Sequence, residues 1–321
     1  MLLFVSDFHI EKGIWVSITI DFLDYLINFC EENRIKDILI GGDIFEKATK
    51  IHNEAFVPLF LKFMEMKNRG LNLFFILGNH DIYGSETNDS IVETFSPFGK
   101  VIKDSETLSI DNHLYDLLSY TKDKTKLPNR AKTLLTHLAI TDFDFDNGYE
   151  NTDDGFSPDD FSHYDLVVSG HFHRHQEKGN IVYAGSPYEK NFGEEGQRKG
   201  FVVVDKYNYT FYPYKNAPRH LTIEVKDFDK YDYKNTFVQV KINKKVENFV
   251  KLRHILYSKG AIEVKPLFEK EESDVKLEEM KMDTGGSIVS IIKQYLKDLK
   301  IDNIDTNNLI GKFDKIVEEI K

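Results

Sequence analysis

The sequence predicts an α/β protein, built as a layered αββα sandwich that is followed by a small α+β domain and a C-terminal helical hairpin. In the first half of the chain, short apolar runs alternate with amphipathic helical patterns, as in a parallel sheet covered by helices. From about residue 101 to residue 214, apolar runs follow one another with few helical patterns between them. The pattern changes again at Asn216, Ala217 and Pro218. We therefore expect three parts, at 1–215, 216–282 and 283–321.

The individual elements follow from the same patterns in chain order. The first half has strands at 1–5, 38–40 and 71–77 and helices at 14–32 and 54–67. The middle has apolar runs at 101–102, 107–110, 114–119, 132–136, 166–169, 181–184 and 201–205. The small domain has strands at 221–225, 237–242 and 261–266 and a helix at 247–258. After the acidic run 269–279, two amphipathic helices are expected at 287–299 and 309–320, because each has one continuous apolar face.

The composition excludes several classes of protein. Hydrophobic residues make up 41% and charged residues 30% of the 321 residues, which is typical of a globular chain and not of a disordered, collagenous or disulfide-rich one. The single cysteine, Cys30, cannot form an internal disulfide. No apolar run is long enough to span a membrane, and the N-terminus lacks a secretory apolar region. We expect a cytoplasmic protein without a membrane partner.

The net charge of −11 argues against nucleic-acid binding if it is taken alone. The charges are unevenly distributed, however. The stretch 141–165 carries nine acidic residues and no Lys or Arg, whereas 234–265 carries eight basic and two acidic residues. Bound divalent cations would also reverse the local field of a site that is rich in carboxylates. The net charge therefore does not exclude a phosphate-bearing substrate.

Ligand-type residues follow the C-terminal ends of five apolar runs. They are Asp7-Phe8-His9, Gly41-Gly42-Asp43, Gly78-Asn79-His80-Asp81, Thr136-His137 and Gly170-His171-Phe172-His173. Ligands of open α/β sheets collect beyond the carboxyl ends of the strands, so these clusters could meet in one crevice. Asp, Asn and His ligands without Cys suit Mn, with Fe or Zn possible. Seven candidate ligands suit two ions about 3.5 to 4 Å apart that share a carboxylate, an arrangement used for in-line phosphoryl displacement.

The ordered set DFH, GGD, GNHD, TH and GHFH resembles the motifs of the calcineurin-like metallophosphoesterases. The GDIF segment, the later segment AGSPYEKNFGEEGQRKGFVVVD and the layout of the C-terminal third resemble the SbcD-type DNA repair and recombination nucleases. These are subunits of the bacterial SbcCD complex, with counterparts in large tailed phages and in the eukaryotic meiotic-recombination nuclease. The motif resemblance covers residues 1 to about 205, and from 216 onward it rests on layout.

The resemblance implies a role for each motif residue. Asp43 would bridge the two ions. Asp7, His9 and His173 would hold the first ion, and Asn79, His137 and His171 the second. His80 would contact the phosphate and assist departure of the leaving group, with Asp81 orienting its ring. The sequence departs from the family at Glu46, where members more often carry Asp or His, and its role stays open.

Residues outside the motifs carry weaker expectations. The basic stretch could contact the backbone of DNA, through Lys241, Lys244, Lys245, Lys251 and Arg253. His175 follows the GHFH motif closely enough to reach substrate. The acidic stretch 141–165 is read as a solvated loop. The two C-terminal helices resemble the helix-loop-helix with which this family binds an SbcC-type, SMC-like ABC ATPase, and the family resemblance favours a homodimer within a heterotetramer.

The function expected from this resemblance is an Mn-dependent DNA nuclease, exonucleolytic on double-stranded ends and endonucleolytic on single strands. Its location would be the cytoplasm, or the host cytoplasm if a phage encodes it. A second hypothesis keeps the two metals but changes the substrate to phosphoproteins, nucleotides or small phosphodiesters. A third hypothesis is an assembly or DNA-tethering module with a structural metal site, which the complete set of expected ligands disfavours.

Overall fold

The computed structural model describes residues 1–83, 88–145, 155–242 and 249–268. The chain divides into two compact units, Met1–Glu269 and Lys270–Lys321. The predicted helices at 287–299 and 309–320 lie outside the described residues, so the helical hairpin stays a prediction. The predicted boundary at residue 215 lies inside the first unit, between two different sheets.

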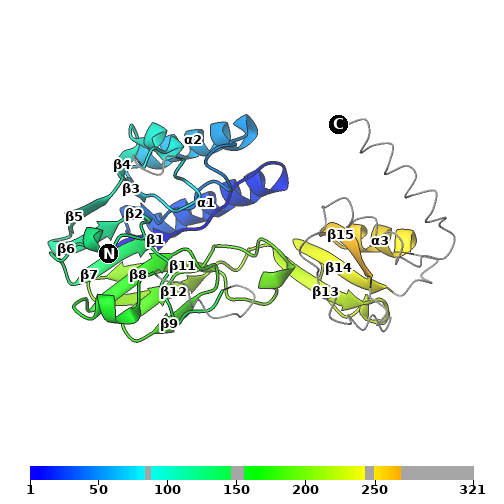
Figure 1. The fold of residues 1–321 in the computed structure, drawn as a ribbon. Helices are drawn as coiled ribbons and strands as arrows, with labels where there is room; N and C mark the ends of the chain where they lie inside the picture. The colour runs from blue at the N-terminus through cyan, green and yellow to red at the C-terminus, as the bar shows by residue number, and fades with distance from the viewer. Residues whose placement is uncertain (84–87, 146–154, 243–248, 269–321) are drawn as a thin grey trace, which may run out of the picture. The chain divides into compact units, whose positions relative to one another are not determined.

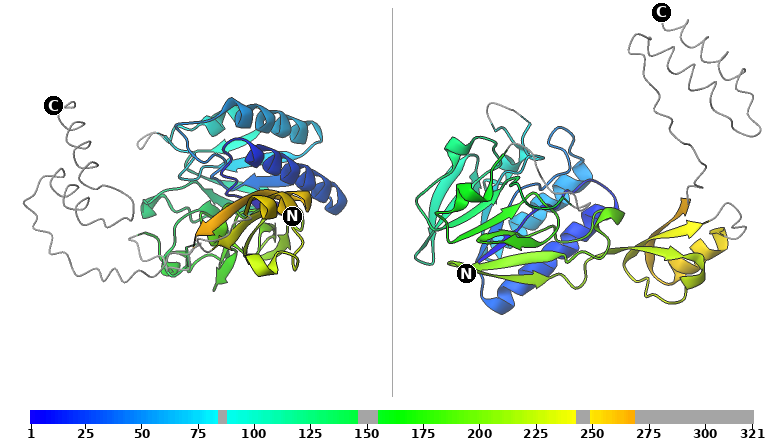
Figure 2. Two further views of the ribbon diagram at one scale, coloured as in Figure 1. Left: turned by 90° about the vertical axis from the view of Figure 1, so that its right-hand side faces the viewer. Right: turned by 60° about the horizontal axis from the view of Figure 1, so that its bottom comes forward.

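The first sheet contains the early strands of the chain. Its order is β12-β11-β1-β2-β3-β4, and β1 to β4 are parallel while β11 and β12 are antiparallel. The strands are β1 Leu2–Val5, β2 Asp37–Ile40, β3 Asn72–Ile76, β4 Gly99–Ile102, β11 Gly200–Asp205 and β12 Asn208–Pro213. Two helices, α1 (Ile14–Asn33) and α2 (Asn53–Asn68), lie side by side over one face of this sheet (Figures 1 and 2).

The second sheet has the order β5-β6-β7-β8-β10-β9. Its inner strands β6, β7, β8 and β10 are parallel, and β5 and β9 pair with them in the antiparallel sense. The strands are β5 Ser105–Ile110, β6 His113–Leu118, β7 Thr133–His137, β8 Leu166–Gly170, β9 Gln176–Lys178 and β10 Ile181–Tyr183.

Alternation along the strands produces the layers. Side chains on one face of both sheets, among them Phe4, Ile76, Leu135 and Val168, are buried against one another between the sheets. Side chains on the other face of the first sheet pack against the helices, where Phe22 of α1 is fully buried. This arrangement confirms the predicted α/β sandwich of two sheets.

The outer face of the second sheet differs from the expected helical layer. Among the described residues, this face is covered by loop side chains and a short 3-10 turn, Pro158–Phe161. Phe156 and Phe161 are buried there. The segment is rich in Asp, Gly and Asn and contains Pro158, so turns compete successfully with a helix. The loop that was expected to be solvated therefore also contributes to the core.

A separate three-stranded parallel sheet forms the small domain. Its order is β13-β14-β15, with β13 Arg219–Glu224, β14 Thr236–Ile242 and β15 Ala261–Phe268. Helix α3, Phe249–Ser258, connects β14 to β15 and buries Leu252 and Leu256 against the sheet. The first two residues of the helix predicted at 247–258 lie outside the described residues. Within the described ranges, no helix has the length and apolar character needed to cross a membrane.

Candidate metal centre

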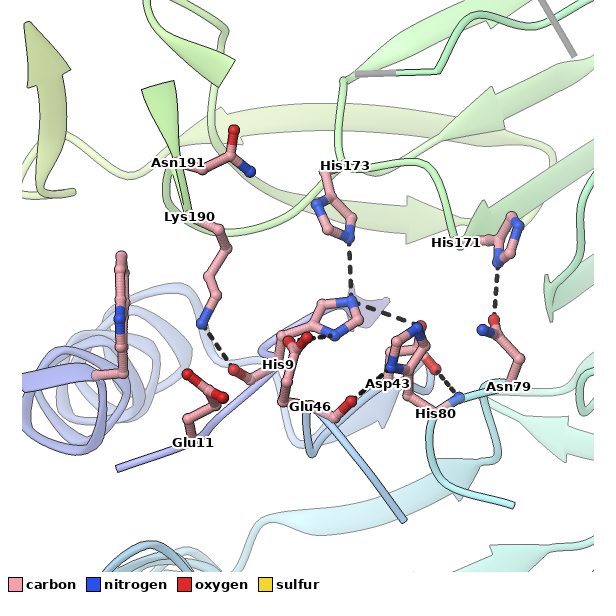
Figure 3. A pocket seen from close by; sticks show the side chains of 11 residues that line it. His9, Glu11, Asp43, Glu46, Asn79, His80, His171, His173, Lys190 and Asn191 are labelled. Atoms are coloured by element: carbon pink, nitrogen blue, oxygen red, sulfur yellow. Dashed lines mark hydrogen bonds and ion pairs between the residues drawn. The ribbon is translucent and has the colours of Figure 1, made fainter. Parts of the chain in front are cut away.

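The five ligand-bearing segments lie at the carboxyl ends of β1, β2, β3, β7 and β8, with His137 as the last residue of β7. The first three strands are parallel neighbours in one sheet and the last two are parallel neighbours in the other, so their ends meet at one edge of the sandwich. A pocket of about 350 Å3 opens there (Figure 3). It is lined by His9, Glu11, Trp15, Asp43, Glu46, Asn79, His80, His171, His173, Lys190 and Asn191.

The backbone of this edge is unusually tight. Four residues adopt left-handed φ angles: Asp7 at 60°, His9 at 42°, Asp43 at 51° and His171 at 95°. Asp and His tolerate this region better than bulky or β-branched side chains do. A Cβ atom on Gly78 would lie 2.1 Å from Oδ1 of Asp43, so only glycine lets these two turns approach so closely.

The first cluster contains Asp7, His9 and His173, whose potential ligand atoms all lie within 4.8 Å of one another. Nε2 of His9 lies 3.0 Å from Nε2 of His173 and 3.9 Å from Oδ1 of Asp7. Figure 3 shows the two imidazole rings pointing toward each other. Two ring nitrogens at this separation need a proton or a metal ion between them, so the geometry is compatible with a metal ion held by both rings.

The second cluster contains Asp43, His137 and His171 within the same limit. Nε2 of His137 lies 3.3 Å from Oδ2 of Asp43, and Nδ1 of His171 lies 2.9 Å from Oδ1 of Asn79. Oδ2 of Asp43 is also 3.5 Å from Nε2 of His9 in the first cluster. Asp43 therefore lies between the two clusters, where a shared ligand would be required.

The electrostatics favour positive charge beside Asp43. Burial disfavours a charged His137, yet the carboxylates of Asp43 and Asp7 raise its pKa to about 9. Burial and the charge of His137 lower the pKa of His171 to about 4. Burial alone would raise the pKa of Asp43, but His137 and His9 hold it well below its usual range. A carboxylate that stays ionised when buried needs cations around it.

The donor atoms fit a pair of divalent cations. A carbonyl can only accept, so Nδ1 of His137 donates to the Gly41 carbonyl at 2.7 Å, and Nε2 is the atom that faces the centre, where a bound cation would take the place of its proton. This Nε2 atom is buried, and no hydrogen-bond partner for it is present among the described residues. Nitrogen and oxygen donors without sulfur suit hard to intermediate divalent ions. The centre is therefore chemically suited to the two ions that the motifs predict.

His80 lies beside this centre, and its ring is held differently from the prediction. Its Nδ1 atom lies 2.6 Å from the carbonyl of Glu46, which can only accept, so Nδ1 donates and Nε2 is left for a ligand. Its backbone N–H donates to Oδ1 of Asp43 at 2.8 Å. Among the described residues, the carboxylate of Asp81 contacts backbone amides and not the ring. The expected orientation of His80 by Asp81 is therefore wrong.

Asp81 instead stabilises the turns that carry the site. It is fully buried and accepts hydrogen bonds from the backbone N–H groups of Gly78 and Ile44, both at 3.0 Å. Burial and the charge of Asp43 raise its pKa to about 7, against the effect of these hydrogen bonds. Successive side chains of a turn point in different directions, so adjacency to His80 in the sequence did not place Asp81 against its ring.

The segment that closes the other side of the pocket makes contacts with the site that no motif predicts. Glu194 is fully buried, with Oε1 3.1 Å from Nδ1 of His173 and Oε2 2.6 Å from Nζ of Lys199. Lys190 donates to the carbonyl of His9 at 2.6 Å, and burial lowers its pKa to about 8 despite Glu46 nearby. All three residues belong to the EKNFGEEGQRKG part of the segment quoted above. A segment with so many charged residues is typical of a solvated loop, so the sequence does not indicate that these side chains are buried in contact with the site.

The residues expected to contact DNA are not part of the pocket. Lys251 and Arg253 are exposed on α3, and Lys241 on β14 forms an ion pair with Glu224 at 3.4 Å. Lys244 and Lys245 lie outside the described residues.

His175 does not line the pocket. Its ring stacks on Phe211 at 4.0 Å between ring centroids, and its Nδ1 atom donates to the carbonyl of Tyr183 at 2.8 Å. The ring is therefore held by packing beside the pocket, and its contact with substrate stays a prediction.

Comparisons with known proteins agree with this geometry. Residues 1–175 match the family model for the calcineurin-like phosphoesterases. The chain is 26% identical over 253 residues to exonuclease subunit 1 of Enterobacteria phage T4, covering 74% of each protein. It is 26% identical over 308 residues to the DNA double-strand break repair protein Mre11 of Nanoarchaeum equitans, covering 81% of this chain and 80% of the relative.

A third relative is the uncharacterized metallophosphoesterase YhaO of Bacillus subtilis, which is 24% identical over 203 residues and covers 56% of this chain and 48% of the relative. The family match covers more than half of the chain and includes all the ligand-type motifs. The chain therefore belongs to the calcineurin-like phosphoesterases and is a metal-dependent phosphodiesterase.

Proposed function

We propose that the chain is the nuclease subunit of an SbcCD-like DNA repair and recombination complex. In this proposal it degrades double-stranded ends as an exonuclease and cleaves single strands as an endonuclease, with Mn2+ as the metal. The observation that carries the proposal is the set of overlapping groups that could hold metal ions: Asp43 belongs to one with His137 and His171 and to another with His9 and His80, and His9 in turn belongs to the group with Asp7 and His173. The similarity to a phage exonuclease subunit and to Mre11 over about three quarters or more of the chain supports DNA as the substrate.

The ligand sets follow the clusters. Asp7, His9 and His173 would hold one ion and Asn79, His137 and His171 the other, with Asp43 bound to both. When bound, two such cations supply a nucleophilic water near neutral pH and neutralise charge on the phosphate.

The residues of the chain position the reactants. The Glu46 carbonyl fixes the His80 ring so that Nε2 is available to the phosphate or the leaving oxygen. A histidine placed there can stabilise transition-state charge and donate a proton to the leaving group. Asp81 keeps the turns that carry Asp43 and His80 together through its bonds to backbone amides.

A nuclease assay tests the function directly. End-labelled duplex and single-stranded circles would be incubated with and without Mn2+, using the wild type beside a His80→Ala variant. Mn-dependent degradation of both substrates by the wild type alone is expected. Rapid turnover of a small phosphomonoester with inert DNA would favour the phosphoprotein, nucleotide or small-diester alternative. If the wild type degrades none of these substrates, the result would favour an assembly or tethering role.

Partners form the second part of the proposal. We place residues 283–321 against an SbcC-type, SMC-like ABC ATPase, and the exposed Lys251 and Arg253 near the DNA backbone. The working location would be the cytoplasm, which is the host cytoplasm for a phage-encoded chain.

Deletion of residues 283–321 is expected to abolish binding to the ATPase while basal nuclease activity stays within about twofold. The metal centre and all described sheets lie before residue 269, so the deletion leaves them intact. Co-purification of the ATPase with the full-length and shortened chains measures the effect. Equal recovery of the ATPase with both chains would contradict the assignment of the tail.

A homodimer is proposed on the basis of α2. Val57, Leu61 and Met64 lie at helical spacing and are 51%, 51% and 39% exposed, which forms an apolar stripe on the helix. Leu61→Asp is expected to convert the dimer to a monomer in sedimentation velocity, because a desolvated charge disfavours an isologous interface. Lys67→Asp, on the flank of the same helix, serves as the control. A wild-type chain that is monomeric at high concentration would contradict the proposal.

A further inference from the structure

The two histidines of the first cluster share a feature that the second cluster lacks. Each has a glutamate on its Nδ1 side, away from the proposed ion. Nδ1 of His173 lies 3.1 Å from Oε1 of Glu194, and Nδ1 of His9 lies 3.3 Å from Oε2 of Glu46. The second is an ion-pair contact and not an aligned hydrogen bond. In the second cluster, Nδ1 of His137 instead meets the neutral carbonyl of Gly41.

Glu194 is held in place from several sides. Besides His173, its Oε1 atom accepts a hydrogen bond from Nδ2 of Asn191 at 3.0 Å. Its Oε2 atom accepts from Nζ of Lys199 at 2.6 Å and from the backbone N–H of Lys190 at 3.2 Å. Glu194 is 0% exposed, whereas Glu46 is partly exposed at the mouth of the pocket. The stronger constraint therefore acts on His173.

Lys199 connects this carboxylate to the backbone of the same histidine. It is 6% exposed, and its ammonium group donates to the carbonyl of His173 and to the hydroxyl of Ser186, both at 2.9 Å. The Lys199–Glu194 pair thus contacts His173 at its main chain and at its ring. Burial would raise the pKa of Glu194, but His173 and Lys199 lower it to about 2.

The chemistry of a carboxylate determines what this contact does. An ionised carboxylate only accepts hydrogen bonds, so it keeps the proton of His173 on Nδ1 and leaves the Nε2 lone pair toward the ion. It also raises the basicity of the ring. We propose that Glu194, clamped by Lys199, is a positioning residue that holds His173 in its metal-binding tautomer, with Glu46 acting more weakly on His9.

This inference rests on the two-cation centre of the proposed function and adds an asymmetry to it. The first ion gains ligands oriented by two carboxylates, whereas His137 in the second site is oriented by a neutral carbonyl. Loss of Glu194 should therefore weaken one ion and spare the other. A glutamine at this position cannot satisfy its surroundings, because His173, Asn191, Lys199 and the Lys190 amide all offer donors. Its NH2 group would favour the wrong tautomer of His173.

Titration of the full chain with Mn2+, followed by the electron paramagnetic resonance signal of free Mn2+, tests the asymmetry. The wild type should bind two equivalents. Glu194→Gln should weaken one equivalent by about 10- to 100-fold and leave the other within about threefold. Glu46→Gln should act on the same equivalent with a smaller effect. Glu195→Gln is the matched control, since this neighbouring glutamate is exposed and contacts Thr222 instead.

Two further measurements separate positioning from simple stability. In the metal-free protein, nitrogen-15 spectra of the imidazoles should show less Nδ1–H tautomer of His173 in Glu194→Gln than in the wild type. A Glu194→Leu, Lys199→Met double variant removes both buried charges and should be more thermally stable than Glu194→Gln. It should still bind one of the two Mn2+ equivalents as weakly as Glu194→Gln does. Recovery of metal affinity together with stability would show a merely structural pair and overturn the inference.

The outcomes also separate this inference from the proposed function. Fewer than two Mn2+ equivalents in the wild type would contradict the two-cation centre, and with it both proposals. If Glu194→Gln binds two Mn2+ equivalents with the affinities of the wild type, only the proposed role of Glu194 is overturned.

Discussion

Asp43→Asn is expected to eliminate the phosphodiesterase activity, with a loss of at least about 10^3-fold in kcat/KM. Asp43 is 2% exposed and lies 3.5 Å from Nε2 of His9 and 3.3 Å from Nε2 of His137, closer to each than Asp7 is, at 3.9 and 4.0 Å. Asparagine keeps the shape and can still accept the hydrogen bond from the His80 amide, but it lacks the negative charge that two cations share. Charge stabilisation by such ions is worth several kcal/mol, and each 1.36 kcal/mol is tenfold in rate.

The measurement pairs steady-state kinetics with metal stoichiometry. Asp43→Asn should bind fewer than two Mn2+ ions per chain under conditions that saturate the wild type. Asp116→Asn is a matched control: Asp116 is also fully buried, but it contacts Thr107 and the backbone of Ala131, outside the pocket. Asp116→Asn should retain both ions. If Asp43→Asn kept both ions and normal activity, the shared-ligand geometry would be wrong.

His80→Asn is expected to lower kcat by about 10^2- to 10^4-fold, the usual contribution of a positioned general acid. In contrast to Asp43→Asn, the number of bound Mn2+ ions should not change, because Nδ1 of His80 is bonded to the Glu46 carbonyl and the ring belongs to neither proposed ligand set. The defect should shrink for a phosphodiester with a nitrophenolate leaving group, which needs little protonation. Kinetics on the two substrates at saturating metal measure this difference.

His113→Asn provides the control for His80→Asn. His113 lies on β6 outside the pocket, and its Nε2 atom is 3.2 Å from Oγ1 of Thr133. Its activity should stay within about twofold of the wild type. An equal loss of kcat on both leaving groups in His80→Asn would argue against proton donation and leave His80 as a residue that only stabilises charge.

The strand ends of the sandwich were predictable because the information is local. A short apolar run ending in Asp7-Phe8-His9 or Gly170-His171-Phe172-His173 carries both the strand and the ligands in a few residues, and the sheet topology brings these ends together. The two missed strands have no such signal. β9, Gln176–Lys178, is three residues long and polar, and β12, Asn208–Pro213, alternates only weakly in burial. Pairing with β10 and β11 stabilises them as strands.

The contacts around the ligands were less predictable because they depend on tertiary structure. Glu194 lies 21 residues after His173, and no periodicity links the two. Asp81, by contrast, was assigned to its sequence neighbour and binds the turn after β2 instead. Strand-end motifs thus identify the residues that point into the site, whereas the residues that hold them are set by how distant turns pack.

The left-handed backbone at Asp7, His9 and Asp43 has a consequence for redesign of this centre toward a thiophilic metal such as cadmium. Cysteine thiolates prefer soft ions, so these positions are natural choices for substitution. Left-handed geometry costs L-residues roughly 1–2 kcal/mol each, and Asp and His are among the few side chains that adopt it readily. Conversion of all three would destabilise the folded chain before any softer ion could bind. The left-handed backbone therefore limits which metal ions this centre can be redesigned to bind.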